Sequence, residues 1–230
     1  MLKSMFRLHD FKRVRDNVLL FLTRIYTWAV LKLNNLTRSR GIGRIPLNWT
    51  TRLQILKDVA KGLIVLHQSL SSQKVPHGNL KSSNVLVYFT NETAHAKLSD
   101  YGYLPLLPSL KSTFAIGKCP EVIEGKKTTH KSDVYCFGVL LLEVLTGKPP
   151  GDDNHEDLTN WVRGVVDSDW SMDLFDLEIL GEKDGHDDML KIAELALECT
   201  EALPERRPNL TQILTRLEEI QYRQVSIGVN

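Results

Sequence analysis

The sequence contains few cysteines: Cys119, Cys136 and Cys199 are the three in its 230 residues. Their number is odd, their spacing is wide, and no two form a C-x-x-C pair. Such a pattern provides neither a disulfide framework nor half of a zinc site, and the histidines do not join the cysteines at zinc-binding spacing. The small number of cysteines therefore favours a protein of the reducing cytosol, without a structural metal.

A long hydrophobic run is also lacking. The most apolar early stretch, residues 18–31, has fourteen residues and includes Arg24. A helix that crosses a bilayer needs about 20 apolar residues. We therefore expect this stretch to form a helix or strand that packs on the domain, with a membrane anchor as the alternative, and the missing cleavage site argues against export.

An overall excess of charge is absent, since the formal net charge is +1. The charges are unevenly distributed, however. Residues 1–46 contain ten Lys or Arg and two Asp, which gives +8, and the remaining chain is −7. The basic surplus thus belongs to a leader, so a nucleic-acid partner is not expected. A solvated chain end is the simplest interpretation of residues 1–46, and contact with an anionic membrane is the alternative.

Regular patterning begins at Pro46. Apolar residues recur every three or four positions and predict a helix over 50–67, while two β-favouring runs, 84–88 and 96–98, predict a small hairpin. Prolines and glycines between 101 and 132 exclude a long helix there. A helix that is apolar nearly all round is predicted over 133–146, followed by helices over 158–166, 189–201 and 210–221, the last capped by Asn209. The expected fold is mainly helical with a minor β element.

Five short motifs follow one another along the chain: His77 to Asn84 (HGNLKSSN), Asp100-Tyr101-Gly102, Pro120-Glu121, Asp133-Val134-Tyr135 and Arg207-Pro208. In this order they resemble a protein kinase. Residues 46–49, 131–149 and 204–208 narrow the resemblance to the C-terminal lobe of a plant leucine-rich-repeat receptor-like kinase. The resemblance implies a mainly α, α+β kinase-like fold with a C-lobe over 38–221, a leader over 1–37 and a tail over 222–230.

The catalytic position departs from the family pattern H-R-D-L-x-x-x-N. Gly78 stands at the position of the arginine, and Asn79 at that of the aspartate which accepts the substrate hydroxyl proton. An amide cannot take a proton near neutral pH, and a positioned base contributes about 10²–10⁴-fold to rate. The resemblance is therefore to the inactive, pseudokinase kind.

Part of the family's nucleotide site is matched. Lys81 corresponds to a phosphate-contacting lysine, and Asn84 and Asp100 correspond to the two magnesium ligands. The glycine-rich loop, strand lysine and helix glutamate that precede these motifs in a whole kinase have no counterparts, so the N-lobe is expected to be missing or vestigial. No cofactor is expected, with weak Mg-ATP binding as the open alternative and no confident metal site.

Five further matched residues are expected to be structural. By the resemblance, Glu121 and Arg207 form the buried ion pair that holds the activation segment, and Asp133 hydrogen-bonds the catalytic-loop backbone. His77 is expected to pack, with Gly102 beside Asp100.

Three functions remain open. The leading hypothesis is a truncated receptor-like pseudokinase that binds other receptor-like kinases or signalling proteins, in the cytoplasm or at the inner face of the plasma membrane. The second is a serine/threonine kinase that binds ATP. The third is a non-functional product of a truncated gene.

Overall fold

The computed structural model describes residues 31–33, 46–69, 75–91, 93–102, 115–151, 157–167, 174–181 and 185–227. Its strands are β1 (Leu31–Lys32), β2 (Val85–Thr90) and β3 (Thr93–Leu98). Its helices are α3 (Trp49–Ser69), α4 (Pro120–Ile123), α5 (His130–Thr146), α6 (Leu158–Asp167), α7 (Leu177–Leu180), α8 (His186–Cys199) and α9 (Leu210–Ile227), with 3₁₀ turns η1 (Ser82–Asn84), η3 (Ala115–Lys118) and η6 (Pro204–Arg206).

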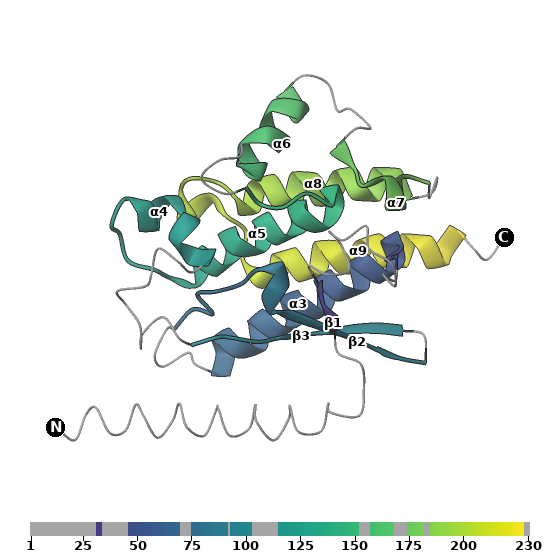
Figure 1. Ribbon diagram of the computed structural model, residues 1–230, viewed down its shortest axis with the longest axis horizontal. Coiled ribbons are helices and arrows are strands. Elements are labelled where there is room, and N and C mark those ends of the chain that lie inside the picture. Colours follow the sequence, from purple (N-terminus) through teal and green to yellow (C-terminus); the bar gives the residue numbers. More distant parts are fainter. Residues whose placement is uncertain are drawn as a thin grey trace.

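Helix α5 lies in the middle of the molecule, with α8 on one side and α3 and the sheet on the other (Figure 1). A capping box of Thr129 and Ser132 begins it, and Gly147, at φ +67°, ends it. Gly138 allows α8 to approach closely, because a Cβ at that position would lie 2.7 Å from the Cβ of Cys199. The nearly all-round apolar pattern thus corresponds to a helix that is buried on several faces.

The sheet has the order β1-β2-β3, and both pairs are antiparallel. Asn91, at φ +46°, lies in the turn that joins β2 to β3. The outer edge of β3 faces α3, where the backbone N–H of Ala96 donates to Oδ2 of Asp58 at 2.9 Å. A helix carboxylate thus satisfies a backbone donor that would otherwise be unpaired at the sheet edge.

Arg52 of α3 joins three helical regions although it is fully buried. Its guanidinium donates to the carbonyl oxygen of Val144 at 2.7 Å and to the carboxylates of Asp176 and Glu178 at 2.7 and 3.0 Å. A buried cation is tolerated only when it is paired and hydrogen-bonded, and this one is both. The helical periodicity of α3 did not identify this residue as part of the core.

The helices predicted from the sequence are confirmed, and apart from the C-terminal end of α9 their ends differ from the predicted ones by at most three residues. The predicted hairpin is also confirmed, and β1 extends it to three strands. Asn209 caps α9 as expected: its Oδ1 accepts from the N–H of Gln212 at 2.9 Å. Helix α9 continues to Ile227, into the segment predicted as a tail.

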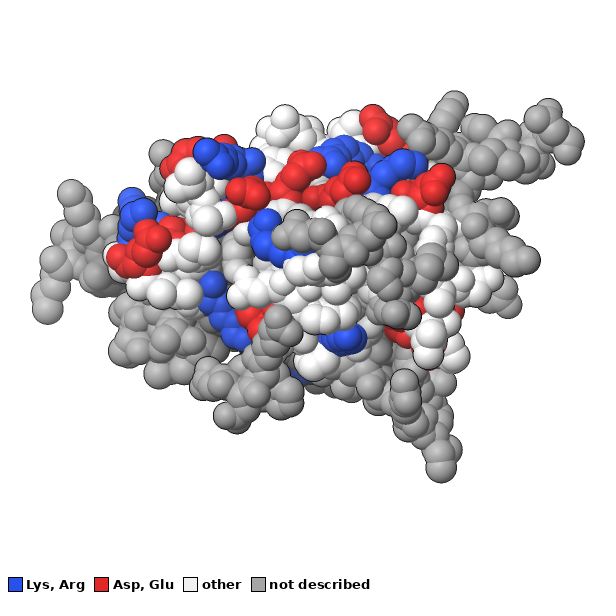
Figure 2. Space-filling view, turned by 90° about the horizontal axis from the view of Figure 1, so that it is seen from above, with Lys and Arg blue, Asp and Glu red and all other residues white. Residues whose placement is uncertain are grey.

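Most of the predicted leader lies outside the described residues. Its described part, residues 31–33, packs on the domain: Leu33 is fully buried and Leu31 contacts the core. Among the residues that the structure describes, no helix has the length and apolar character needed to span a bilayer. Basic and acidic side chains are mixed on the face shown in Figure 2.

Candidate functional site

The carboxylate of Asp133 holds the catalytic-loop segment, His77 to Asn84, through its backbone. Asp133 is fully buried in the first turn of α5. It accepts hydrogen bonds from the backbone N–H groups of His77 at 2.7 Å and Gly78 at 2.9 Å, and from Nε2 of His67 at 2.7 Å. Three donors compensate the loss of hydration of this carboxylate, so α5 fixes the position of the segment.

Gly78 adopts φ +77°, a conformation that is costly for residues with a Cβ. In this conformation the N–H of Gly78 donates to Asp133. A glycine avoids the backbone strain that a residue with a Cβ would have at this position.

His77 is 1% exposed, and burial lowers the pKa of its imidazole although Asp133 partly opposes the shift. Its Nδ1 accepts from the backbone N–H of Asn79 at 3.3 Å, so the proton of the neutral ring is on Nε2. The ring meets Tyr101 edge-on, with 6.1 Å between the ring centroids. The backbone carbonyl of His77 accepts from the N–H of Gly102, at 3.4 Å. These contacts of His77 and Gly102 are those expected of residues that pack and maintain the fold.

The side-chain amide of Asn79 is hydrogen-bonded to the backbone of the protein. Its Oδ1 accepts from the backbone N–H of Ala115 at 3.3 Å, and the carbonyl oxygen of Gly78 accepts from the N–H of Ile116 at 3.4 Å. These two bonds connect η3 to the catalytic-loop segment. The side-chain oxygen at the family's base position is therefore engaged by the backbone of the following segment.

Of the remaining matched residues, Lys81 and Asn84 belong to the catalytic-loop segment itself, and Asp100 follows strand β3. Asn84 is 5% exposed, and its Nδ2 donates to the carbonyl oxygen of Asn79 at 2.8 Å. The backbone carbonyl oxygen of Asn84 accepts a hydrogen bond from the backbone N–H of Ser99 at 2.9 Å. Asp100 is the next residue after Ser99. Lys81 and Asp100 are exposed, and Asp100 adopts φ +58°.

These residues fit a magnesium ion in kind but provide few ligands. The Nδ2 bond of Asn84 leaves its Oδ1 for a cation, and the exposed carboxylate of Asp100 accepts a bond from the hydroxyl of Ser99 at 3.2 Å. Mg²⁺ prefers such oxygen atoms and completes its six ligands with water and substrate phosphates. Within the described part of the chain, no group of three or more His, Cys, Asp or Glu side chains is placed to hold a metal.

Glu121, Ser132 and Arg207 form what we call the α4 anchor. Arg207 donates to the two carboxylate oxygens of Glu121 at 2.9 and 2.7 Å, and the hydroxyl of Ser132 donates to the first oxygen at 2.6 Å. Burial would raise the pKa of Glu121, but the hydrogen bonds from Arg207 and Ser132 outweigh it and lower the pKa. The anchor joins α4 to α5 and to the turn before α9.

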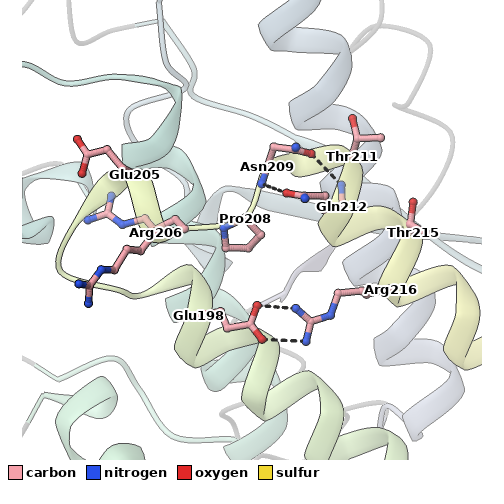
Figure 3. Close-up of a pocket in the computed structure, with 10 residues that line it drawn as sticks. Glu198, Glu205, Arg206, Pro208, Asn209, Thr211, Gln212, Thr215 and Arg216 are labelled. Carbon is pink, nitrogen blue, oxygen red and sulfur yellow. Dashed lines mark hydrogen bonds and ion pairs between the residues drawn. The ribbon is translucent and has the colours of Figure 1, made fainter.

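An open groove of about 820 Å³ lies between the C-terminal end of α8 and the start of α9 (Figure 3). Arg216 donates to both carboxylate oxygens of Glu198, at 2.6 and 3.0 Å, on one side of it. Its other lining residues come from η6, the turn that follows η6 and the first turns of α9, and they include Arg207 of the α4 anchor. No residue of the catalytic-loop segment lines this groove, so the groove is separate from that segment.

Sequence reasoning missed two contributors to the site. His67, at the end of α3, binds Asp133 and stacks on His130 with the centroids 3.8 Å apart. Ala115 supplies the N–H that engages Asn79. A histidine at the end of a predicted helix gives a weak signal, and a backbone donor in an irregular segment gives none.

Comparison with known proteins agrees with this geometry. The family model for protein tyrosine and serine/threonine kinases matches residues 12–217, which takes in part of the predicted leader. A probable leucine-rich repeat receptor-like protein kinase of Arabidopsis thaliana is 41% identical over 189 residues, covering 79% of this chain and 28% of that protein. An Arabidopsis thaliana receptor-like protein kinase whose name describes it as probably inactive is 35% identical over 206 residues, covering 86% of this chain and 56% of that protein.

Among solved structures, the kinase domain of maize sucrose-induced receptor kinase 1 bound to AMP-PNP superposes with a TM-score of 0.68. It is 30% identical, and the match covers 84% of this chain and 67% of that one. The chain spans about a quarter of the length of the first of the curated relatives named above and a little over half of the length of the second. The kinase-like fold expected from the motifs is confirmed, and the chain belongs to the protein tyrosine and serine/threonine kinase family, with the kinase domains of plant receptor-like kinases as its relatives.

Proposed function

We propose that this chain is a receptor-like pseudokinase, an interaction module for signalling proteins that does not transfer phosphate. The observation that supports it best is Asn79. An amide stands at the position of the proton acceptor, and its oxygen accepts a bond from Ala115. An amide cannot act as a base near neutral pH, and this one also has a backbone partner in place of a substrate hydroxyl.

Nucleotide binding is proposed to be weak at most. Lys81, Asn84 and Asp100 would meet the phosphates and magnesium of ATP, where the ion would neutralise phosphate charge. The two oxygen ligands need the phosphates to complete the ion's coordination. The sequence contains no recognisable glycine-rich loop, strand lysine or helix glutamate, so among the described residues we expect Lys81, Asn84 and Asp100 to be the ones that meet the phosphates.

The first experiment measures phosphate transfer and nucleotide binding with the purified full chain. We expect no magnesium-dependent transfer from ATP to a generic protein substrate, for the wild type and for Asn79→Asp alike. Asp100→Ala serves as the matched control that removes a metal ligand. Transfer by the wild type that is lost in Asp100→Ala would overturn the proposal. Thermal unfolding with millimolar Mg-ATP should show little shift, since stabilisation follows RT ln(1 + [L]/Kd).

The second candidate function is a serine/threonine protein kinase. The observation that favours it is that Lys81 and Asn84 belong to the catalytic-loop segment, while the backbone N–H of Ser99, the residue before Asp100, donates to the carbonyl oxygen of Asn84. It predicts transfer that survives in Asn79→Ala if another group takes the proton, but not in Asp100→Ala. The same assay therefore separates the two functions.

The proposed partners are kinase domains of other receptor-like kinases, in the cytoplasm or at the inner face of the plasma membrane. This proposal follows from the family alone, because the relatives are receptor-like protein kinases. We expect binding to a panel of such domains to be unchanged by Mg-ATP and by Asp100→Ala, because an interaction module does not need the nucleotide site. Absence of binding to every domain of the panel would count against a scaffold. Because residues 1–46 are basic, we also expect the chain to bind vesicles that contain phosphatidylserine.

A further inference from the structure

Two of the three cysteines lie together inside the domain although they are 17 residues apart in sequence. The Sγ atoms of Cys119 and Cys136 are separated by 4.0 Å. Cys119 precedes α4 as its N-cap residue, and Cys136 lies in the middle of α5. Their exposed fractions are 0% and 3%. This pair could not be predicted from the sequence, because neither cysteine belongs to a C-x-x-C motif.

The surroundings of Cys136 disfavour its thiolate, and the thiol of Cys119 is hydrogen-bonded to α5. The Sγ of Cys119 donates to the carbonyl oxygen of Ser132 at 3.4 Å, one helical turn before Cys136. The pKa of the Cys136 thiol is raised by its hydrogen bond with Cys119 and by burial. The thiols are therefore stable in the closed structure, and reaction requires that the segment before α4 moves away from α5.

We propose that Cys119 and Cys136 are a redox modification site, at which a peroxide or a small-molecule disulfide converts the two thiols to one intramolecular disulfide. With hydrogen peroxide, one thiolate attacks an oxygen and becomes a sulfenic acid with loss of hydroxide. The second thiol then displaces the sulfenic hydroxyl as water, and the S–S bond forms. The two sulfur atoms together lose two electrons and two protons, and the peroxide becomes two molecules of water.

The disulfide changes how the activation segment is held. Its S–S bond is about 2.0 Å long, so the sulfur atoms approach from 4.0 Å and the bond from Cys119 to Ser132 is lost. Ser132 also donates to Glu121 of the α4 anchor. Oxidation therefore adds a covalent link between the start of α4 and α5, beside an anchor that is otherwise non-covalent. A role in redox sensing is independent of whether the chain transfers phosphate.

Cys199 provides a matched control inside the same protein. It is as deeply buried as Cys119, and burial raises the pKa of its thiol. All three cysteines belong to the described residues, and no S–S contact joins Cys199 to either of the others. A buried thiol without a neighbouring thiol has no partner for an intramolecular disulfide.

The test treats the purified full chain with hydrogen peroxide, removes the oxidant, unfolds the chain in guanidinium chloride with N-ethylmaleimide to block every free thiol, and maps peptides by mass spectrometry. We expect one blocked thiol per chain, at Cys199, and a Cys119–Cys136 peptide that dithiothreitol separates. Cys199→Ser should form the same link, whereas Cys136→Ser should form none. The melting temperature of the oxidised wild type should rise by several degrees, because the link restricts the unfolded chain.

Three blocked thiols after an oxidant treatment that fully links a control dithiol protein would overturn the proposal. A link that includes Cys199, or one that joins two chains, would overturn it as well. If Cys136→Ser fails to fold, mapping of the wild type and of Cys199→Ser still decides between the outcomes. None of these measurements depends on ATP, so their failure is distinguishable from failure of the proposed function.

Discussion

The catalytic-loop segment and the α4 anchor are each held by a buried carboxylate, yet they differ in what surrounds it. Asp133 accepts two backbone N–H groups and one imidazole, whereas Glu121 binds a guanidinium and a hydroxyl. By the resemblance in sequence, the anchor follows the kinase pattern, while the segment held by Asp133 departs from it at Gly78 and Asn79. The contacts that hold both regions are therefore independent of the proposed loss of the base at Asn79.

The largest effect is expected at the α4 anchor. Arg207→Ala should lower the free energy of unfolding by about 4 kcal/mol, because it leaves the carboxylate of Glu121 buried without its cation. Arg216→Ala is the matched control. Arg216 makes the same two-bond contact with Glu198, but the two side chains are 37% and 50% exposed. Urea unfolding should show a loss of about 1 kcal/mol or less there. Equal losses would mean that burial does not distinguish the two pairs.

Removal of the other carboxylate should cost somewhat less. Asp133→Ala leaves the N–H groups of His77 and Gly78 without their acceptor, and we expect a loss of about 3 kcal/mol. Hydrogen exchange of these two amides should become much faster, while the amides of α9 change little. Protection that persists at His77 and Gly78 would show that Asp133 does not hold the segment.

The pH dependence of the anchor gives a third comparison. Glu121→Gln should lose about 2 kcal/mol at pH 7, where the carboxylate accepts charge-assisted bonds. The pKa of Glu121 is lower in the folded state, so its contribution is complete above the unfolded value of about 4.5 and is lost as pH falls through the folded pKa. The difference between wild type and variant should therefore shrink below pH 4.5. A difference that stays constant to pH 2 would contradict this assignment.

The smallest effect concerns the backbone of the catalytic-loop segment. Gly78→Ala should cost about 1 kcal/mol, because φ is +77° there. Gly164→Ala on α6 is the control, since a Cβ at that position meets no atom within 4 Å and the helix favours alanine. Thermal unfolding should thus show opposite signs for the two variants, and a stabilised Gly78→Ala would exclude backbone strain as a factor.

Local patterns in the sequence predict much of this fold. The apolar residues of α3, α5, α8 and α9 recur at helical spacing along their buried faces. The two strands of the β2–β3 hairpin are separated by only a few residues, which include the turn. For strand β1 the sequence predicted only a helix or strand within residues 18–31, because two residues give no periodicity and its partner Val87 is 56 residues from Leu31. Arg52 was missed for a similar reason, since its partners Val144 and Asp176 are distant in sequence.

The candidate site likewise has a part that the sequence predicts and a part that it does not. The identities of Asn79 and Gly78 predict that chemistry is altered there, because they follow from a short motif. The bond from Ala115 to Asn79 and the contact between Cys119 and Cys136 could not be predicted, since each depends on how an irregular segment returns to the domain. Spacing along the chain contains no information about such returns.

The carboxylate of Asp58 at the outer edge of β3 has a consequence for assembly. A sheet edge with free N–H groups invites another strand, either from a peptide ligand or from a second molecule in an aggregate. Here a helix side chain already occupies that donor, so β-augmentation at this edge would first have to displace α3. Any association of the chain through this side must therefore use side-chain surfaces.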